Sequence, residues 1–220
     1  MLVFIGCGVT LVLLVVLWVL YTLAQREPDF YADALAANPQ EQARDGDDFE
    51  RQLLRLQNES RTEEDWQVEF TETQVNGWLA ADLPVKFPSA LPPRVSKPRV
   101  GIDVNQLNIA FQFDSRRIKG VVNAEVDVFC TDVPRQLAVQ IKRVRSGIIP
   151  IPITAIADRI TLALRKLGLS VEWTEVDSDP VALIDFPNDL LTLGDKHIQI
   201  QSVQLLEETL VLSGKSISIK

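Results

Sequence analysis

A run of 23 residues without a charged side chain, from Leu2 to Ala24, constrains this chain more than any other feature. At a rise of about 1.5 Å per residue, a helix of that length spans roughly 34 Å, which is enough to cross the hydrocarbon core of a bilayer. No basic segment precedes the run, and it is longer than the apolar part of a cleaved signal peptide, about 7 to 15 residues. The sequence therefore predicts a transmembrane signal anchor over residues 1–25.

The segment after the anchor, residues 26–65, is strongly acidic. It holds 12 Asp and Glu residues and 5 Lys and Arg residues. Residues 66–220, by contrast, hold 18 acidic and 17 basic residues, so they are nearly neutral. Anionic lipid would repel such a segment, so we interpret it as a helical spacer and not as a second membrane contact. The positive-inside rule gives acidic residues little weight. We predict a single-pass membrane protein whose C-terminal domain lies outside the cytoplasm.

Two helical stretches are expected within this spacer. The first is short or irregular and is broken at Pro39 and Gly46, because both residue types favour turns. The second follows Asp47 and Asp48 and runs to about Arg61. Its apolar stripe consists of Phe49, Leu53, Leu54 and Leu56. This second helix either packs on the following domain or stands as a stalk.

The domain over residues 66–220 begins with a short alternating strand, Trp66 to Phe70, followed by a helix. Thr71 can accept a hydrogen bond from the Gln74 amide while the Gln74 side chain reaches back, which is a capping box. The helix ends at Pro84 and has one apolar face. That face carries Val75, Trp78, Leu79 and Leu83. Five prolines within residues 84–98 then predict an extended, irregular loop.

Residues 100–142 change to a period of two, which is typical of strands. Val100, Ile102 and Val104 alternate with polar residues, and Asn105-Gln106 is the predicted turn. The same alternation continues from Leu107 to Phe113, from Val122 to Cys130 and from Leu137 to Ile141. Only one side of each strand is apolar. The pattern therefore predicts an antiparallel sheet with one covered face and one solvated face.

The stretch SGIIPIPITAIADRI, residues 146–160, ends this meander. Pro150 and Pro152 cannot continue a paired central strand, and Pro152 suits the start of a helix. Apolar residues recur at helical spacing from Ile153 to Leu167, and Gly168 ends the helix. Four further alternating segments follow, over residues 169–175, 181–186, 197–205 and 210–219. We predict an α+β fold in which an antiparallel sheet packs with two amphipathic helices.

Two short blocks carry a resemblance to a known family. The first, FTETQVNGWLAADL, contributes Phe70, Thr71, Gln74, Asn76 and Leu79, and the second, at 146–160, contributes Gly147, Pro150 and Pro152. With an anchor before them and strands after them, these blocks resemble the YpmS-like family of small anchored bacterial proteins of unknown function. The resemblance covers about residues 66–219. The acidic segment from Arg26 to Asp65 and the tryptophan at Trp78 depart from the family pattern.

Such domains are more distantly similar to tubular lipid-binding folds, in which a curved antiparallel sheet wraps an amphipathic helix around an apolar channel. That similarity implies a curved sheet here, with a ligand channel between helix and sheet. The residues that would line the channel are Trp78, Leu79, Ile149, Ile151, Ile156 and Ile160. Lys142, Arg143 and Arg145 either contact anionic headgroups at its mouth or are solvated charges at strand ends. A solid core satisfies the same periodicity, and the apolar residues then simply pack.

Residue types with catalytic or metal-binding chemistry are scarce in the sequence. The single histidine, His197, lies in the alternating run HIQIQ, on the side of Gln199 and Gln201, and the two cysteines, Cys7 and Cys130, are far apart. They cannot form a zinc site of a common type, and no phosphate-binding loop or nucleophile elbow is present. A net charge of −8 without a concentrated basic face disfavours nucleic acid as a partner.

These observations favour a binding protein over an enzyme. We predict a membrane-tethered, non-enzymatic domain, with no cofactor or metal, that binds a lipid or another apolar ligand. The sequence names no protein partner. The alternative is an envelope scaffold whose surface binds another protein and whose interior is fully packed.

Overall fold

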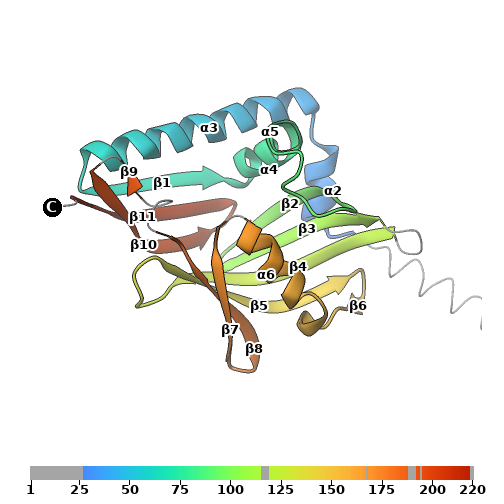
Figure 1. The fold of residues 1–220 in the computed structure, drawn as a ribbon. Coiled ribbons are helices and arrows are strands. Elements are labelled where there is room, and N and C mark those ends of the chain that lie inside the picture. The colour runs from blue at the N-terminus through green and yellow to red at the C-terminus, as the bar shows by residue number, and fades with distance from the viewer. Residues whose placement is uncertain (1–26, 115–118, 167, 188–191, 194, 219–220) are drawn as a thin grey trace, which may run out of the picture.

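The chain folds as α+β, with a large antiparallel sheet and few helices (Figure 1). The computed structural model describes residues 27–114, 119–166, 168–187, 192–193 and 195–218. The predicted anchor over residues 1–25, together with Cys7 and Leu167, lies outside the described residues. Within the described ranges, no helix combines the length and apolar character needed to span a membrane.

The helices and strands follow in chain order. The helices in the described part of the chain are α2 (Asp29–Ala36), α3 (Pro39–Thr62), α4 (Glu72–Ala81), α5 (Leu83–Lys86) and α6 (Ala157–Lys166), with a 3-10 turn at Ile153–Ala155. A small sheet has the strand order β1–β11–β10–β9. It consists of β1 (Asp65–Thr71), β9 (Thr192–Leu193), β10 (Lys196–Leu206) and β11 (Thr209–Ser218).

The large sheet has the strand order β2–β3–β4–β5–β8–β7, with β6 paired to β5. It consists of β2 (Val95–Asp103), β3 (Gln106–Asp114), β4 (Lys119–Cys130), β5 (Gln136–Ser146), β6 (Ile149–Pro150), β7 (Ser170–Val176) and β8 (Asp179–Asp185). All paired neighbours in both sheets are antiparallel. The four strands predicted after residue 168 correspond to β7, β8, β10 and β11 and are confirmed.

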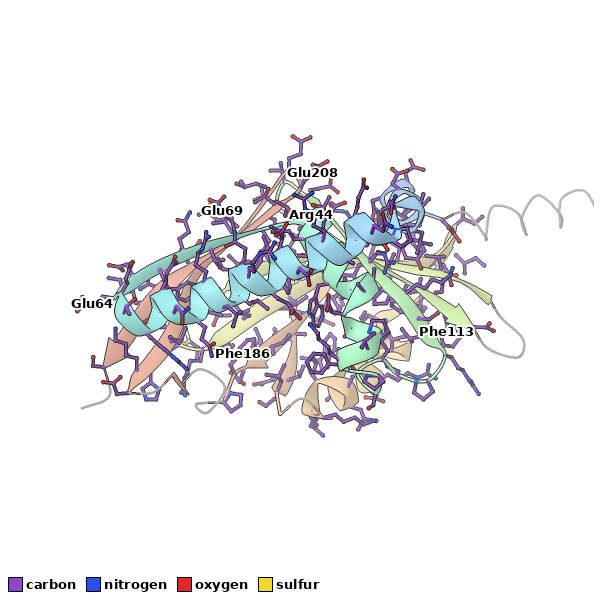
Figure 2. All side chains as sticks on the ribbon, turned by 90° about the horizontal axis from the view of Figure 1, so that it is seen from above. Arg44, Glu64, Glu69, Phe113, Phe186 and Glu208 are labelled. Carbon is purple, nitrogen blue, oxygen red and sulfur yellow. The ribbon has the colours of Figure 1, made fainter. Side chains whose placement is uncertain are left out.

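The acidic segment forms α2 and α3, and both helices pack on the sheets. Phe49 of α3 contacts Phe70 of β1, with ring centroids 4.9 Å apart. Seen from above, α3 runs along the small sheet, with Arg44 in its first half and Glu64 beyond its last residue (Figure 2). In α2, the buried Tyr31 packs on the large sheet against Ala110 and Val121. The helix predicted after Asp47 therefore packs on the domain and does not stand as a stalk.

The predicted break at Gly46 is wrong, because Gly46 lies inside α3 at the point where α3 meets α4. A Cβ atom on Gly77 of α4 would lie 2.5 Å from the Gln42 carbonyl oxygen and 2.7 Å from the Gly46 nitrogen. A Cβ atom on Gly46 would lie 2.5 Å from Asp82 Oδ2. The two backbones can approach this closely only because both residues lack a side chain. The predicted break at Pro39 is confirmed, because α2 ends at Ala36 and α3 begins at Pro39.

The predicted capping box at the start of α4 is confirmed. The Gln74 amide donates to Thr71 Oγ1 at 3.2 Å, and the Thr71 amide donates to Gln74 Oε1 at 3.0 Å. The helix ends at Ala81, and Pro84 lies in the single turn of α5 instead of ending α4.

Side chains of α4 seal the outer edge of β2. Asn76 Nδ2 donates to the Val100 carbonyl at 2.8 Å, and Asn76 Oδ1 accepts from the Val100 amide at 2.8 Å. Glu72 Oε2 accepts from the Ile102 amide at 2.7 Å. These bonds replace those that another strand would make, so the edge is closed to strand addition from Val100 to Ile102.

The two faces of the large sheet differ from the prediction. One face carries the expected apolar cluster, in which the buried Val126, Ile141 and Val144 contact isoleucines of the segment around α6. The other face was predicted to be solvated, and this is wrong at several positions, because α2 and the β7–β8 turn cover part of it. The polar residues buried on that face are Arg99, Asn108, Asn123 and Gln140.

The proline-containing stretch at 146–160 turns the chain away from the sheet. Gly147, with φ of 56°, forms a tight turn, after which Ile149 pairs with Ser146 and Pro150 pairs with Arg145. Pro150 therefore does pair, but only in the two-residue strand β6. Pro152 precedes the 3-10 turn that leads into α6.

Candidate functional site

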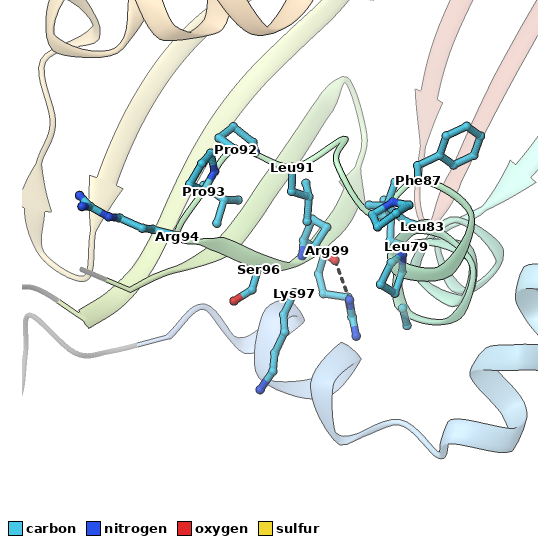
Figure 3. Close-up of a pocket in the computed structure, with 15 residues that line it drawn as sticks. Leu79, Leu83, Phe87, Leu91, Pro92, Pro93, Arg94, Ser96, Lys97 and Arg99 are labelled. Carbon is cyan, nitrogen blue, oxygen red and sulfur yellow. Dashed lines mark hydrogen bonds between the residues drawn. The ribbon is translucent and has the colours of Figure 1, made fainter. Parts of the chain in front are cut away.

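A pocket of about 470 Å³ lies between α4, α5 and the first half of β2 (Figure 3). Its lining consists of Leu79, Ala80, Leu83, Pro84, Phe87, Pro88 and residues 91–99. All five prolines of the predicted irregular loop belong to this lining. Because a proline ring fixes φ, these residues stiffen the wall of the pocket before any ligand arrives.

A row of aromatic rings positions one wall of the pocket. The Trp78 ring lies between Phe49, at a centroid distance of 5.8 Å, and Phe87, at 6.0 Å. Trp78 Nε1 donates to Glu50 Oε1 at 3.2 Å. Phe87, at the end of the row, is 53% exposed at the pocket. The row thus connects the core under α3 to the pocket.

Ion pairs hold α5 against α3 behind this row. Lys86 Nζ lies 2.8 Å from Asp82 Oδ1 and also pairs with Glu50. The hydrogen bond from Lys86, with a smaller contribution from Trp78, lowers the pKa of the Glu50 carboxyl, so Glu50 stays ionised at neutral pH.

A β-bulge in β2 shapes the opposite wall. Ser96 pairs with Gln112 but Arg99 pairs with Ala110, so β2 contains one extra residue. Lys97, in the bulge, has φ of 51°, and its carbonyl accepts from the Tyr31 hydroxyl at 3.0 Å. A bulge re-aims the side chains on either side of it. As a result, Arg99 lies on the same face as Ala110 and is only 5% exposed.

The structure separates the ligand residues that the sequence grouped together. Leu79 lines the pocket, and Trp78 lies behind it in contact with Phe87. Ile151, Ile156 and Ile160 instead pack on the cluster of Val126, Ile141 and Val144 under α6. Ile149 belongs to neither group and is 54% exposed in β6.

The predicted headgroup residues Lys142, Arg143 and Arg145 are paired with carboxylates of neighbouring strands. Lys142 Nζ lies 3.5 Å from Asp127 and 3.3 Å from Asp179, while Arg143 and Arg145 lie 3.8 and 2.5 Å from Glu125. Glu125 and Asp127 alternate with Val126, which faces α6. The structure therefore does not bring these cations together with the isoleucines around α6.

Arg99 and the proline loop were missed as site residues. Alternation with Val100 and Ile102 placed Arg99 on the face that was expected to be solvated. A signal was nevertheless present in Pro98, because a proline within a strand marks an edge or a bulge.

The remaining reactive residue types do not form a site in the described part of the chain. No group of three or more His, Cys, Asp or Glu is placed there to hold a metal ion. Burial raises the pKa of the Cys130 thiol, which disfavours the reactive thiolate. His197 lies on β10 opposite Ile217 of β11.

Comparisons with protein-family models, with curated proteins and with solved structures find no match, so the resemblance to the YpmS-like family stays a prediction.

Proposed function

We propose that the chain is a membrane-tethered, non-enzymatic domain that binds a lipid or another apolar ligand in the pocket between α4, α5 and β2. The observation that carries this proposal is the pocket itself. Its volume of about 470 Å³ is in the range of small-molecule sites, about 300–1,000 Å³. Leucine, proline and phenylalanine make up most of its lining.

The position of the pocket supports a membrane source for the ligand. The proposed anchor ends at residue 25, and α2 begins at Asp29. Tyr31, six residues after the end of the proposed anchor, donates a hydrogen bond to the carbonyl of Lys97, which lines the pocket. A tether this short would hold the pocket close to the membrane surface and allow ligand exchange with the nearby leaflet.

The interface between α6 and the large sheet is a second candidate. None of the ten residues of α6 is fully buried, although the helix has an apolar face. Ile156 and Ile160 are only partly buried where they meet the sheet. The incomplete burial of α6 supports a channel between this helix and the sheet. Such a channel is what the resemblance to tubular lipid-binding folds implies, with a curved sheet and two amphipathic helices forming its walls.

The test is native mass spectrometry of the full chain in a non-ionic detergent, measured first as purified, to detect bound lipid. It is then repeated after the lipid is stripped and a fluorescent acyl probe is added. Ser96→Trp would fill the pocket from an exposed lining position, and Ser218→Trp, at the exposed end of β11, is the matched control. We expect Ser96→Trp to lose most of the bound probe and the control to retain it.

Other outcomes separate the alternatives. Loss of the probe in Ile156→Asn but not in Ser96→Trp would move the ligand to the α6 interface. If the parent chain neither carries lipid nor takes up the probe, the ligand-binding proposal is wrong and the scaffold alternative takes its place.

A further inference from the structure

Arg99 is a buried cation without an ion-pair partner. Its side chain is 5% exposed, and no carboxylate of the described residues lies within ion-pair distance. Nη1 donates to the Pro98 carbonyl at 2.6 Å, while the buried Nε has no hydrogen-bond partner. A buried charge of this kind destabilises a protein unless something neutralises it. An arginine in such a place needs a partner, and the described residues do not supply one.

The surroundings of Arg99 do not neutralise it. The neighbour that acts on it electrostatically is Tyr31, whose hydroxyl is already bonded to Lys97. Burial lowers the pKa of Arg99, but the ordinary pKa of a guanidinium is so far above neutral pH that Arg99 remains protonated. The site therefore presents a permanent positive charge.

The pocket that Arg99 lines is basic in an acidic protein. Its described lining contains Arg94, Lys97 and Arg99 and no acidic residue, although the whole chain carries a net charge of −8. In Figure 3, Arg99 and Lys97 extend from β2 on the side of α2, while Leu79 and Leu83 lie beside them on the side of α4 and α5. One end of a bound molecule would meet positive charge, and the rest would meet hydrocarbon.

We propose that Arg99 binds the phosphate of a membrane phospholipid whose acyl chain occupies the apolar part of the pocket. A guanidinium presents two parallel donors that match a phosphate, and such charged hydrogen bonds are the stronger ones. The leaflet beside the proposed anchor supplies a phosphate attached to an acyl chain. This inference rests on the proposed function and adds the class of ligand.

The test compares probes that carry the same hydrocarbon chain with different heads. Thermal unfolding of the full, lipid-stripped chain in non-ionic detergent is followed with hexadecyl phosphate, hexadecanol, palmitate or inorganic phosphate. Hexadecyl phosphate should raise Tm at the lowest concentration, and inorganic phosphate alone should not raise it. Tighter binding of palmitate than of hexadecyl phosphate would contradict the assignment to phosphate.

Variants assign the effect to Arg99. Arg99→Met should weaken binding of hexadecyl phosphate about 10- to 100-fold, as expected for loss of a charged hydrogen bond, and leave hexadecanol unchanged. Arg99→Lys should recover part of the loss. Arg61→Met, at an exposed arginine in the last turn of α3 and outside the pocket lining, is the matched control and should bind like the parent. An equal loss in Arg61→Met would mean a general surface charge effect and overturn the inference.

The ligand-free protein gives an independent readout. Arg99→Met removes an unpaired buried charge, so without a probe its Tm should not be lower than that of the parent. A clearly lower Tm would assign Arg99 a structural role and overturn the inference. If hexadecanol binds the parent and Arg99→Met changes nothing, the proposed function stands and the phosphate assignment falls. If no probe binds the parent, the proposed function itself fails.

Discussion

At the scale of single residues, Asn76 shows how one side chain can complete a sheet. Its amide group exchanges both hydrogen bonds with the backbone of Val100, as a strand residue would. The side chain is buried, so replacing it would leave both Val100 groups without partners. Asn76 also belongs to the block that resembles the YpmS-like family, and this pairing gives the residue a physical role.

Tyr31 leads to a prediction about pH. Burial raises the pKa of Tyr31 to about 12, with Arg99 opposing the shift. Since the unfolded phenol ionises near pH 10, the stability that Tyr31 contributes is complete below pH 10 and is lost as the pH rises toward 12. Tyr31→Phe removes the bond to Lys97, so it should lower the free energy of unfolding by about 1 kcal/mol at pH 8.

The same variant provides its own control, because it has no phenol to ionise. Relative to Tyr31→Phe, the parent should lose about 1.4 kcal/mol of stability between pH 8 and pH 11. Urea unfolding of both full chains in non-ionic detergent measures this difference. An unchanged difference at the two pH values would show that Tyr31 does not ionise in this way.

Residue-level predictions succeeded where the determining contacts are local. The capping box of Thr71 and Gln74 depends on residues three apart, so the sequence contains everything it needs. Arg99 is the opposite case. Its burial depends on a bulge at Lys97 and on α2 packing across the strand, and neither follows from alternation in β2.

At the scale of elements, the contact of α3 with α4 relies on two glycines that face one another. In an exposed helix interior, changing glycine to alanine stabilises by about 1 kcal/mol. Here a Cβ atom added to Gly77 of α4 would lie only 2.5 to 2.7 Å from backbone atoms of α3. The usual effect of the substitution should therefore reverse.

We expect Gly77→Ala to lower the free energy of unfolding by about 1–3 kcal/mol, through overpacking. Gly46→Ala meets a carboxylate oxygen that can move, so its loss should be smaller. Ala43→Gly, at an exposed position of α3, is the control and should lose only about 1 kcal/mol. Urea unfolding compares the three variants. Stabilisation by Gly77→Ala would contradict the close helix contact.

Strands were predicted more reliably than their arrangement. Alternation identified the strands from Val100 onward, because one-sided burial imposes a period of two. It contains no information on which strands pair, so the division into two sheets could not be read from it. The sequence predicts a break in α3 at Gly46 because the contact that accounts for a glycine there is also distant in sequence. Gly46 lies inside the helix against Gly77 of α4. The same lack of pairing information explains why the sequence analysis assigns Trp78 and Ile156 to one channel. In the structure Trp78 contacts Phe87, whereas Ile156 packs on the cluster of Val126 and its neighbours.

At the scale of the whole molecule, the proposed topology can be tested directly. A phosphatase reporter that is active only outside the cytoplasm, fused after Lys220, should be active. A matched fusion with three lysines inserted after Gln25 should lose activity, because positive charge keeps the flanking segment in the cytoplasm. Inactivity of the unmodified fusion, with the reporter found in the cytoplasm, would contradict the proposed orientation.

The pairing of β1 with β11 has a consequence for the order in which the chain can fold. Of the described strands, β1 is synthesised first, yet it pairs along its whole length with the last of them, from Asp65 opposite Lys215 to Thr71 opposite Thr209. Contacts so distant in sequence form slowly. Until β11 emerges from the ribosome, the aromatic side chains of Trp66 and Phe70 lack that strand beside them. The nascent chain thus carries β1 unpaired while residues 72–208 are made, and a chain that stops before Thr209 never pairs it, although Phe49 of α3 can already contact Phe70.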